Sequence, residues 1–236
     1  MNIFIISVIL ASIINYLTVK MVSKKCDIYS YYFKNNKLNL IYFLPVFNLL
    51  IKCKKSRVKV LLINIITIMS ISFIFYKFKM NIYLFYYIVF FTILMLVILI
   101  DMDTYTIPNK IILFGIIFSV SFNLFYGNIF ESIFGGLVSF FSIFSIVFLV
   151  EKFIKKEAMG RGDIKLFSMI GLFFGYEKTF IVINLSIYTC LFYFFITNMI
   201  SFINKKDYKT ILPFGPFISI SSILVMFLSF NNISIM

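Results

Sequence analysis

Long apolar segments, separated by short polar connections, recur from one end of the 236-residue chain to the other. Most are close to the 20 or so residues that an α-helix needs to cross a bilayer. They are too continuous for the alternating strands of a transmembrane barrel. The pattern predicts an all-α, polytopic integral membrane protein with about eight transmembrane helices, at residues 2–21, 59–76, 81–101, 109–126, 129–151, 164–176, 178–203 and 211–230.

The sixth of these segments, residues 164–176, is short. Its thirteen residues would reach only about 20 Å at 1.5 Å per residue, against roughly 30 Å of hydrocarbon. The sequence therefore leaves two paths for this segment, a crossing helix and a re-entrant one. We adopt the crossing path as the prediction.

Composition narrows the possible functions. The chain is 62% hydrophobic and 13% charged, whereas soluble domains carry roughly 25% charged residues. It contains no histidine, which excludes His-containing zinc protease motifs and nucleophiles activated by histidine. The three cysteines, Cys26, Cys53 and Cys190, are too scattered for a disulfide framework or a four-thiolate zinc site.

The distribution of charge predicts the orientation. With the N-terminus outside and eight crossings, 19 of the 22 Lys and Arg fall on one side, and only Lys77, Lys79 and Lys178 fall on the other. A re-entrant sixth segment would change the split to 17 against 5. Because positive loops stay in the cytoplasm, we predict a multi-pass protein of the inner (cytoplasmic) membrane with its basic loops inside. The net charge of +13 then indicates attraction to anionic lipid, not to nucleic acid.

Two acidic residues stand at the edges of apolar segments. Asp101 ends one segment and Asp163 begins another, with two crossings between them. An even number of crossings places both at the cytoplasmic edge, whichever path residues 164–176 take. A carboxylate at a bilayer edge suggests function. Taken singly, however, Asp101 and Asp103 also fit loop acids that face water, and Asp163 fits an ordinary helix N-cap.

Together, two acids at one depth suggest paired-carboxylate chemistry. Adjacent carboxylates share a proton, because both cannot ionise cheaply. The ionised carboxylate can take a proton from water, and the protonated one can donate to a scissile carbonyl oxygen. This predicts peptide hydrolysis that needs neither metal nor histidine.

Glycines and prolines surround these acids and recur further along the chain. Gly160 and Gly162 allow backbone conformations closed to other residues, and also close approach of another chain. Gly171 and Gly175, with Ser168 one turn earlier, predict close helix packing. The run from Pro213 to Pro216 predicts a tight turn or a broken helix start.

These motifs resemble the prepilin peptidase (type IV leader peptidase) family, intramembrane aspartyl proteases of the GxGD type. The first is an Asp seven residues before a Pro followed by Asp or Asn, the second is G-x-G-D before an Ile-Lys-Leu stretch, and the third is a late Pro-Phe-Gly-Pro-Phe. They are present here as Asp101 with Pro108-Asn109, as Gly160-Arg161-Gly162-Asp163 and as Pro213 to Phe217, and the resemblance covers residues 95 to 230.

The resemblance implies a function. Asp101 and Asp163 would be the catalytic pair, with Asp103 as the alternative first acid. Cleavage would occur at the cytoplasmic membrane face. The substrate would be a type IV prepilin or a secretion pseudopilin, whose short basic leader precedes a single hydrophobic helix. The residues expected to support the motifs are Gly160, Gly162, Pro108, Pro213 and Gly215.

The N-terminal region differs from that of bifunctional relatives. Residues 1–58 are interpreted as one transmembrane helix and a reduced basic cytoplasmic loop, and residues 59–236 as the protease domain. Relatives carry two Cys-x-x-Cys pairs in this loop and also N-methylate the new N-terminus. Cys26 and Cys53 each lack that partner, so we expect no zinc, and we do not predict methyl transfer from S-adenosylmethionine.

Two other functions remain open from the sequence. One is a proton- or cation-coupled transporter that uses the Asp pair as a relay, and the other is an inactive membrane scaffold. Transporter sites cluster near the bilayer midplane, whereas these acids lie at one edge, so the peptidase is the favoured hypothesis.

Overall fold

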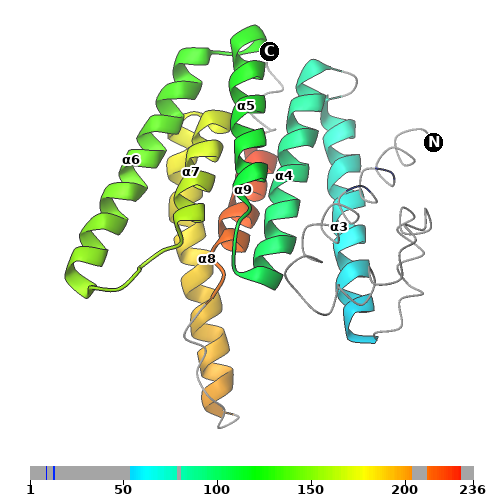
Figure 1. Ribbon diagram of the computed structural model, residues 1–236. Coiled ribbons are helices and arrows are strands. Elements are labelled where there is room, and N and C mark those ends of the chain that lie inside the picture. The colour runs from blue at the N-terminus through cyan, green and yellow to red at the C-terminus, as the bar shows by residue number, and fades with distance from the viewer. Residues whose placement is uncertain (1–8, 10–12, 14–53, 79–80, 204–211, 230–236) are drawn as a thin grey trace, which may run out of the picture. The chain divides into compact units, whose positions relative to one another are not determined.

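A computed structural model describes residues 9, 13, 54–78, 81–203 and 212–229, and within them every regular element is an α-helix (Figure 1). The all-α prediction is confirmed. Each predicted segment from 59–76 onward corresponds to one helix, whereas segment 2–21, apart from residues 9 and 13, and both Cys26 and Cys53 lie outside the described residues. The helices are α3 (Lys54–Phe78), α4 (Ile82–Thr104), α5 (Asn109–Tyr126), α6 (Ile129–Ile154), α7 (Arg161–Phe174), α8 (Tyr176–Ile203) and α9 (Gly215–Ser229).

Four of the described helices, α4, α5, α6 and α8, are long and apolar enough to cross a membrane. The apolar stretches of α3 (Ile65–Phe78) and of α9 are shorter. Large apolar side chains such as Phe114, Phe141 and Phe195 are exposed on α5, α6 and α8, as expected for helices whose outer surface meets lipid and not water. The chain is a polytopic membrane protein.

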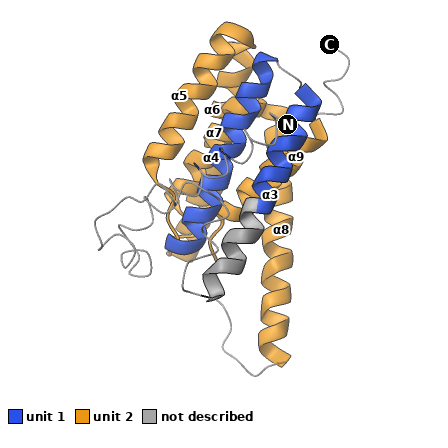
Figure 2. Ribbon diagram, turned by 90° about the vertical axis from the view of Figure 1, so that its right-hand side faces the viewer, with its two compact units in different colours: residues 1–104 blue, residues 105–236 orange. Residues whose placement is uncertain are grey.

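The chain divides into two compact units, residues 1–104 and residues 105–236 (Figure 2). In the first unit α3 and α4 pack against each other, and the rings of Phe78 and Tyr87 stack with centroids 4.6 Å apart. Helix α4 is apolar on every side, so it has no polar face to expose. Its buried residues accordingly lie all round the helix. The division predicted after residue 58 stays a prediction.

In the second unit, α7 packs most closely against α6 (Figure 1). The two helices meet at glycines, because a Cβ atom on Gly171 would overlap the backbone carbonyl of Gly135. The hydroxyl of Ser168 donates to the carbonyl oxygen of Gly136 at 3.2 Å. The close packing predicted from Gly171 and its neighbours is confirmed, and its partner surface is a pair of glycines on α6.

The C-terminal end of α7 is held by polar side chains from two other helices. The carbonyl oxygen of Leu172 accepts hydrogen bonds from Ser132 Oγ at 2.5 Å and from Asn123 Nδ2 at 3.4 Å. The last carbonyls of a helix have no partner within it, and in an apolar surrounding such a group is costly. These side chains let a short helix end among apolar neighbours. Gly175, at φ +78°, then reverses the chain into α8.

The path of α7 follows from these contacts. Its first turn lies against Ile107, just before α5, and its end lies beside Glu131, at the start of α6. It therefore runs antiparallel to α6 along the α5–α6 hairpin, although its 14 residues span only about 21 Å. The crossing of the membrane by this segment stays a prediction, because α7 is shorter than the described helices that are long and apolar enough to cross.

Candidate functional site

Asp163 lies in the first turn of α7 with its side chain buried, 8% exposed. The N-cap of this helix is Gly160, and Asp163 is the third helical residue, whose N–H donates to the Gly160 carbonyl at 3.0 Å. The interpretation of Asp163 as an ordinary N-cap is therefore wrong. The position still favours a carboxylate, because the N-terminal end of a helix stabilises negative charge.

The glycines of the second motif provide space, not unusual backbone angles. Gly160 has φ −62° and ψ 132°, which any residue can adopt, and Gly162 lies inside the helix. Among the described residues the only glycine with positive φ is Gly175. A Cβ atom on Gly160 would come within 3.1 Å of Asp163 Oδ2. The prediction of special backbone conformations was wrong at Gly160 and Gly162, whereas the prediction of close approach is confirmed.

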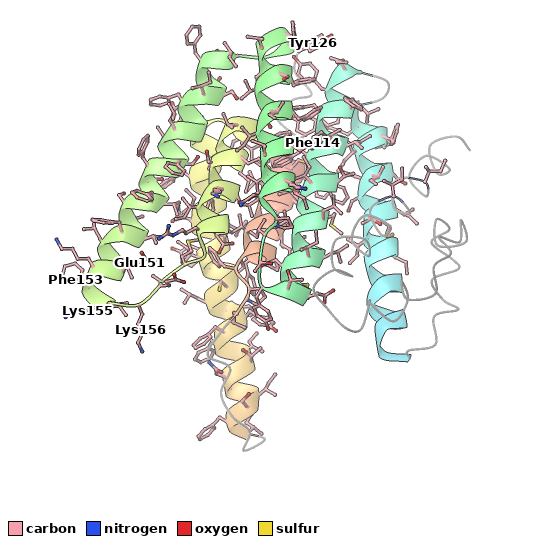
Figure 3. All side chains as sticks on the ribbon, viewed as in Figure 1. Phe114, Tyr126, Glu151, Phe153, Lys155 and Lys156 are labelled. Atoms are coloured by element: carbon pink, nitrogen blue, oxygen red, sulfur yellow. The ribbon has the colours of Figure 1, made fainter. Side chains whose placement is uncertain are left out.

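The connection that leads into the second motif is ordered by its own contacts (Figure 3). Helix α6 ends at Lys155, which adopts a left-handed conformation with φ 55°. Glu151 then reaches forward, and its Oε1 accepts the backbone N–H of Ala158 at 3.3 Å. Lys155 and Lys156 extend outward from this end of α6 (Figure 3). The end of the second unit that carries Asp163 is thus also a basic end.

The C-terminal end of the first motif, at residues 107–109, packs directly on the second motif. Pro108 is the N-cap of α5, immediately before its first helical residue. A Cβ atom on Gly162 would lie 3.3 Å from Ile107 Cβ, and Lys165 Nζ donates to Asn109 Oδ1 at 3.0 Å. Sequence reasoning missed both contacts. The only signal was that Asn109 and Lys165 belong to the two recognised motifs.

Asp101 lies in the last turn of α4 and is 4% exposed. Its interpretation as a loop acid facing water is therefore wrong, because the helix continues three residues beyond it. Asp103 belongs to the same turn but is more exposed, which favours Asp101 as the functional acid. The pairing of Asp101 with Asp163, which lie in different compact units, stays a prediction.

The third motif begins α9 and adjoins the helix that carries Asp163. The carbonyl oxygen of Phe214 accepts the N–H groups of Phe217 and Ile218, so the helix starts immediately after the Pro-Phe pair. Gly215 and Pro216 are buried. The ring of Phe214 lies 6.3 Å from that of Phe167, one turn after Asp163 on α7. The predicted helix start is confirmed, and it belongs to the surroundings of the second motif.

The candidate site can be compared with known proteins. A model of the type IV leader peptidase family matches residues 88–195, a range that includes both Asp101 and Asp163. This match covers less than half of the chain, so it shows what residues 88–195 are similar to. The third motif, at Pro213, lies beyond the matched range.

Curated relatives agree with this family. The chain is similar to the prepilin leader peptidase/N-methyltransferase of Stutzerimonas stutzeri, with 28% identity over 127 residues, and to that of Pseudomonas aeruginosa, with 29% identity over 128 residues. Each match covers 52% of this chain and 42% of the relative, so the chain corresponds to less than half of the relatives' length. No solved structure matches the chain significantly.

Among the residues that the structure describes, no three His, Cys, Asp or Glu side chains gather closely enough to hold a metal ion. The thiol of Cys190 is free and partly buried on α8. Cys26 and Cys53, the residues relevant to a zinc site, lie outside the described residues.

Proposed function

We propose that this chain is a membrane-embedded aspartyl endopeptidase that removes the leader peptide of type IV prepilins or pseudopilins. The observation that carries the proposal is the buried carboxylate of Asp163, held in the first turn of α7 inside the segment that the family model matches. A buried acid of this kind in a membrane protein is costly to keep and indicates function. The names of the relatives supply the substrate class.

The two helix ends suggest different roles for the two acids. Asp163 lies at a helix N-terminus, which favours the ionised form, whereas Asp101 lies in the last turn of α4, where the helix dipole disfavours negative charge. Asp163 is then the base that takes a proton from water, and Asp101 the acid that donates to the scissile carbonyl oxygen. The hydroxyl adds to the carbonyl carbon. The C–N bond breaks as a proton passes to the leaving amine.

The charges of the second unit support an active site at the cytoplasmic face of the inner membrane. Its opposite end, at the starts of α6 and α8, has two acids and one lysine, namely Glu131, Glu177 and Lys178. Positive charge gathers on the cytoplasmic side of membrane proteins. The basic residues at the Asp163 end are Lys110, Lys152, Lys155, Lys156, Arg161 and Lys165.

A basic leader is repelled by a basic face at short range. We propose that anionic lipids reduce this repulsion, because they concentrate near clusters of Lys and Arg. The substrate's own hydrophobic helix holds it in the bilayer beside the site.

The proposed reaction uses neither zinc nor S-adenosylmethionine. Two separate cysteines, Cys26 and Cys53, do not supply the four thiolates of a structural zinc site. The N-methyltransferase part of the relatives' name is therefore not extended to this chain.

The test is cleavage of a synthetic prepilin by the detergent-purified chain. Asp101→Ala and Asp163→Ala should abolish cleavage, and the two Asp→Asn variants should be nearly inactive, because an amide cannot take or shuttle the proton. Glu157→Gln, in the exposed α6–α7 connection, is the matched acid control and should retain full activity. Full cleavage by either Asp→Ala variant contradicts the proposal. Proton-driven uptake by liposomes containing the chain would favour the transporter instead.

A further inference from the structure

Two contacts join the tail of the first motif to the helix of the second. Ile107 packs on Gly162, and Lys165 Nζ donates to Asn109 Oδ1. We call these two contacts the linker clamp. Both lie within the second compact unit, where residues 105–108 connect to the start of α5.

The orientation of Lys165 indicates how it acts. Residues on an α-helix are about 100° apart, so Lys165 points roughly opposite to Asp163, two positions earlier. The side chain of Asp163 is buried and that of Lys165 is exposed. The ammonium group is therefore directed toward α5 and away from the acid that would act on the substrate. Its role is to position other groups, not to take part in the chemistry.

The linker clamp lies at one end of residues 105–108, a short segment that follows the helix turn carrying Asp101. Residues 105–108 run back to the last turn of α4, which carries Asp101. The clamp fixes the other end of this segment against the first turn of α7, which carries Asp163. Within the second unit, the clamp therefore fixes the turn of α7 that carries the Asp163 carboxylate against the start of α5.

We propose that Lys165 and Asn109 are positioning residues that hold the first turn of α7, and with it the Asp163 carboxylate, in place. The proposal depends on the proposed peptidase function. A displacement of a reacting group by about 1 Å can cost up to roughly 100-fold in rate. Loosening the clamp should therefore lower kcat and change the pH range of activity, without changing substrate affinity.

The test compares variants of the full-length chain in lipid-supplemented detergent, with a synthetic prepilin as substrate. Lys165→Met and Asn109→Leu each remove the bond and should each lower kcat by roughly three- to ten-fold with KM nearly unchanged. The double variant should lose no more than either single variant, because the same bond is lost. Lys165→Arg and Asn109→Asp keep a donor and an acceptor and should retain most of the activity.

The control is Lys110→Met, which removes the neighbouring positive charge on α5 and should leave kcat unchanged. The inference would be overturned if the double variant lost kcat by the product of the two single losses. It would also be overturned if the variants changed only KM, or if Lys110→Met lowered kcat equally. A kcat that falls together with the thermal midpoint, while the pH profile keeps its shape, would also overturn it, because that pattern shows only a structural role. Equal cleavage by wild type and Asp163→Asn would instead refute the peptidase function itself.

Discussion

The carboxylate of Asp163 lies close to Gly160, so that a Cβ atom added to this glycine would come within 3.1 Å of Asp163 Oδ2. That separation is shorter than an ordinary van der Waals contact, and the backbone angles of Gly160 suit any residue. Glycine is therefore favoured at this position by the space that the carboxylate takes, and not by the turn.

Gly160→Ala should displace the Asp163 carboxylate by a few tenths of an ångström and lower kcat by about ten-fold or more. The free energy of unfolding should change by less than about 1 kcal/mol, because the added methyl group meets only one side chain. Ala158→Ser adds one atom in the same connection, at an exposed position, and should have no effect. Normal cleavage by Gly160→Ala would show that the carboxylate does not need this space.

The glycines between α6 and α7 should differ in their tolerance of alanine. A Cβ atom on Gly171 would overlap backbone atoms of Gly135, whereas one on Gly136 would meet the Leu172 side chain at 2.6 Å, which can rotate away. Overpacking costs about 1–3 kcal/mol, against a gain of about 1 kcal/mol in helix propensity. Gly171→Ala should therefore destabilise by about 2 kcal/mol, and Gly136→Ala should be nearly neutral. Thermal unfolding in detergent measures both, and equal midpoints would contradict this packing.

The hydrogen bond from Ser132 to the Leu172 carbonyl should contribute to stability. Ser132→Ala should cost about 1 kcal/mol, because a buried acceptor then keeps only the longer bond from Asn123. Adding Asn123→Ala should cost more than the sum of the single changes, since the carbonyl then loses both donors. Ser145→Ala, whose hydroxyl bonds within its own exposed turn, is the control. A strictly additive double variant would argue against shared capping of this carbonyl.

The two acids at the end of α4 should respond differently to amidation. Asp101 is buried, whereas Asp103 in the same turn is partly exposed. Asp101→Asn should lower kcat by at least about 100-fold, and Asp103→Asn by no more than a few-fold. Circular dichroism and the thermal midpoint check that both variants fold. If Asp103→Asn is the inactive variant, the first acid has been assigned to the wrong residue.

The sequence alone located the helices from residue 59 onward, because apolar segments in a bilayer must satisfy their backbone hydrogen bonds internally and therefore form helices. It was less accurate at the helix ends. Predicted segments 81–101 and 164–176 are found as Ile82–Thr104 and Arg161–Phe174. Both shifts extend a helix across charged residues, at which an apolar pattern stops, and both place a candidate acid inside a helix. The interpretations of Asp101 as a loop acid and of Asp163 as an N-cap failed for this reason.

What the sequence by itself determined was the class of protein and the identity of the important motifs, since length, apolarity and residue spacing are local properties of the chain. Only the tertiary structure decided why those motif residues are needed. The space beside Gly160, the contact of Ile107 with Gly162 and the bond from Lys165 to Asn109 depend on how closely separate segments approach each other. No local pattern encodes that distance, because it results from the packing of all the helices together.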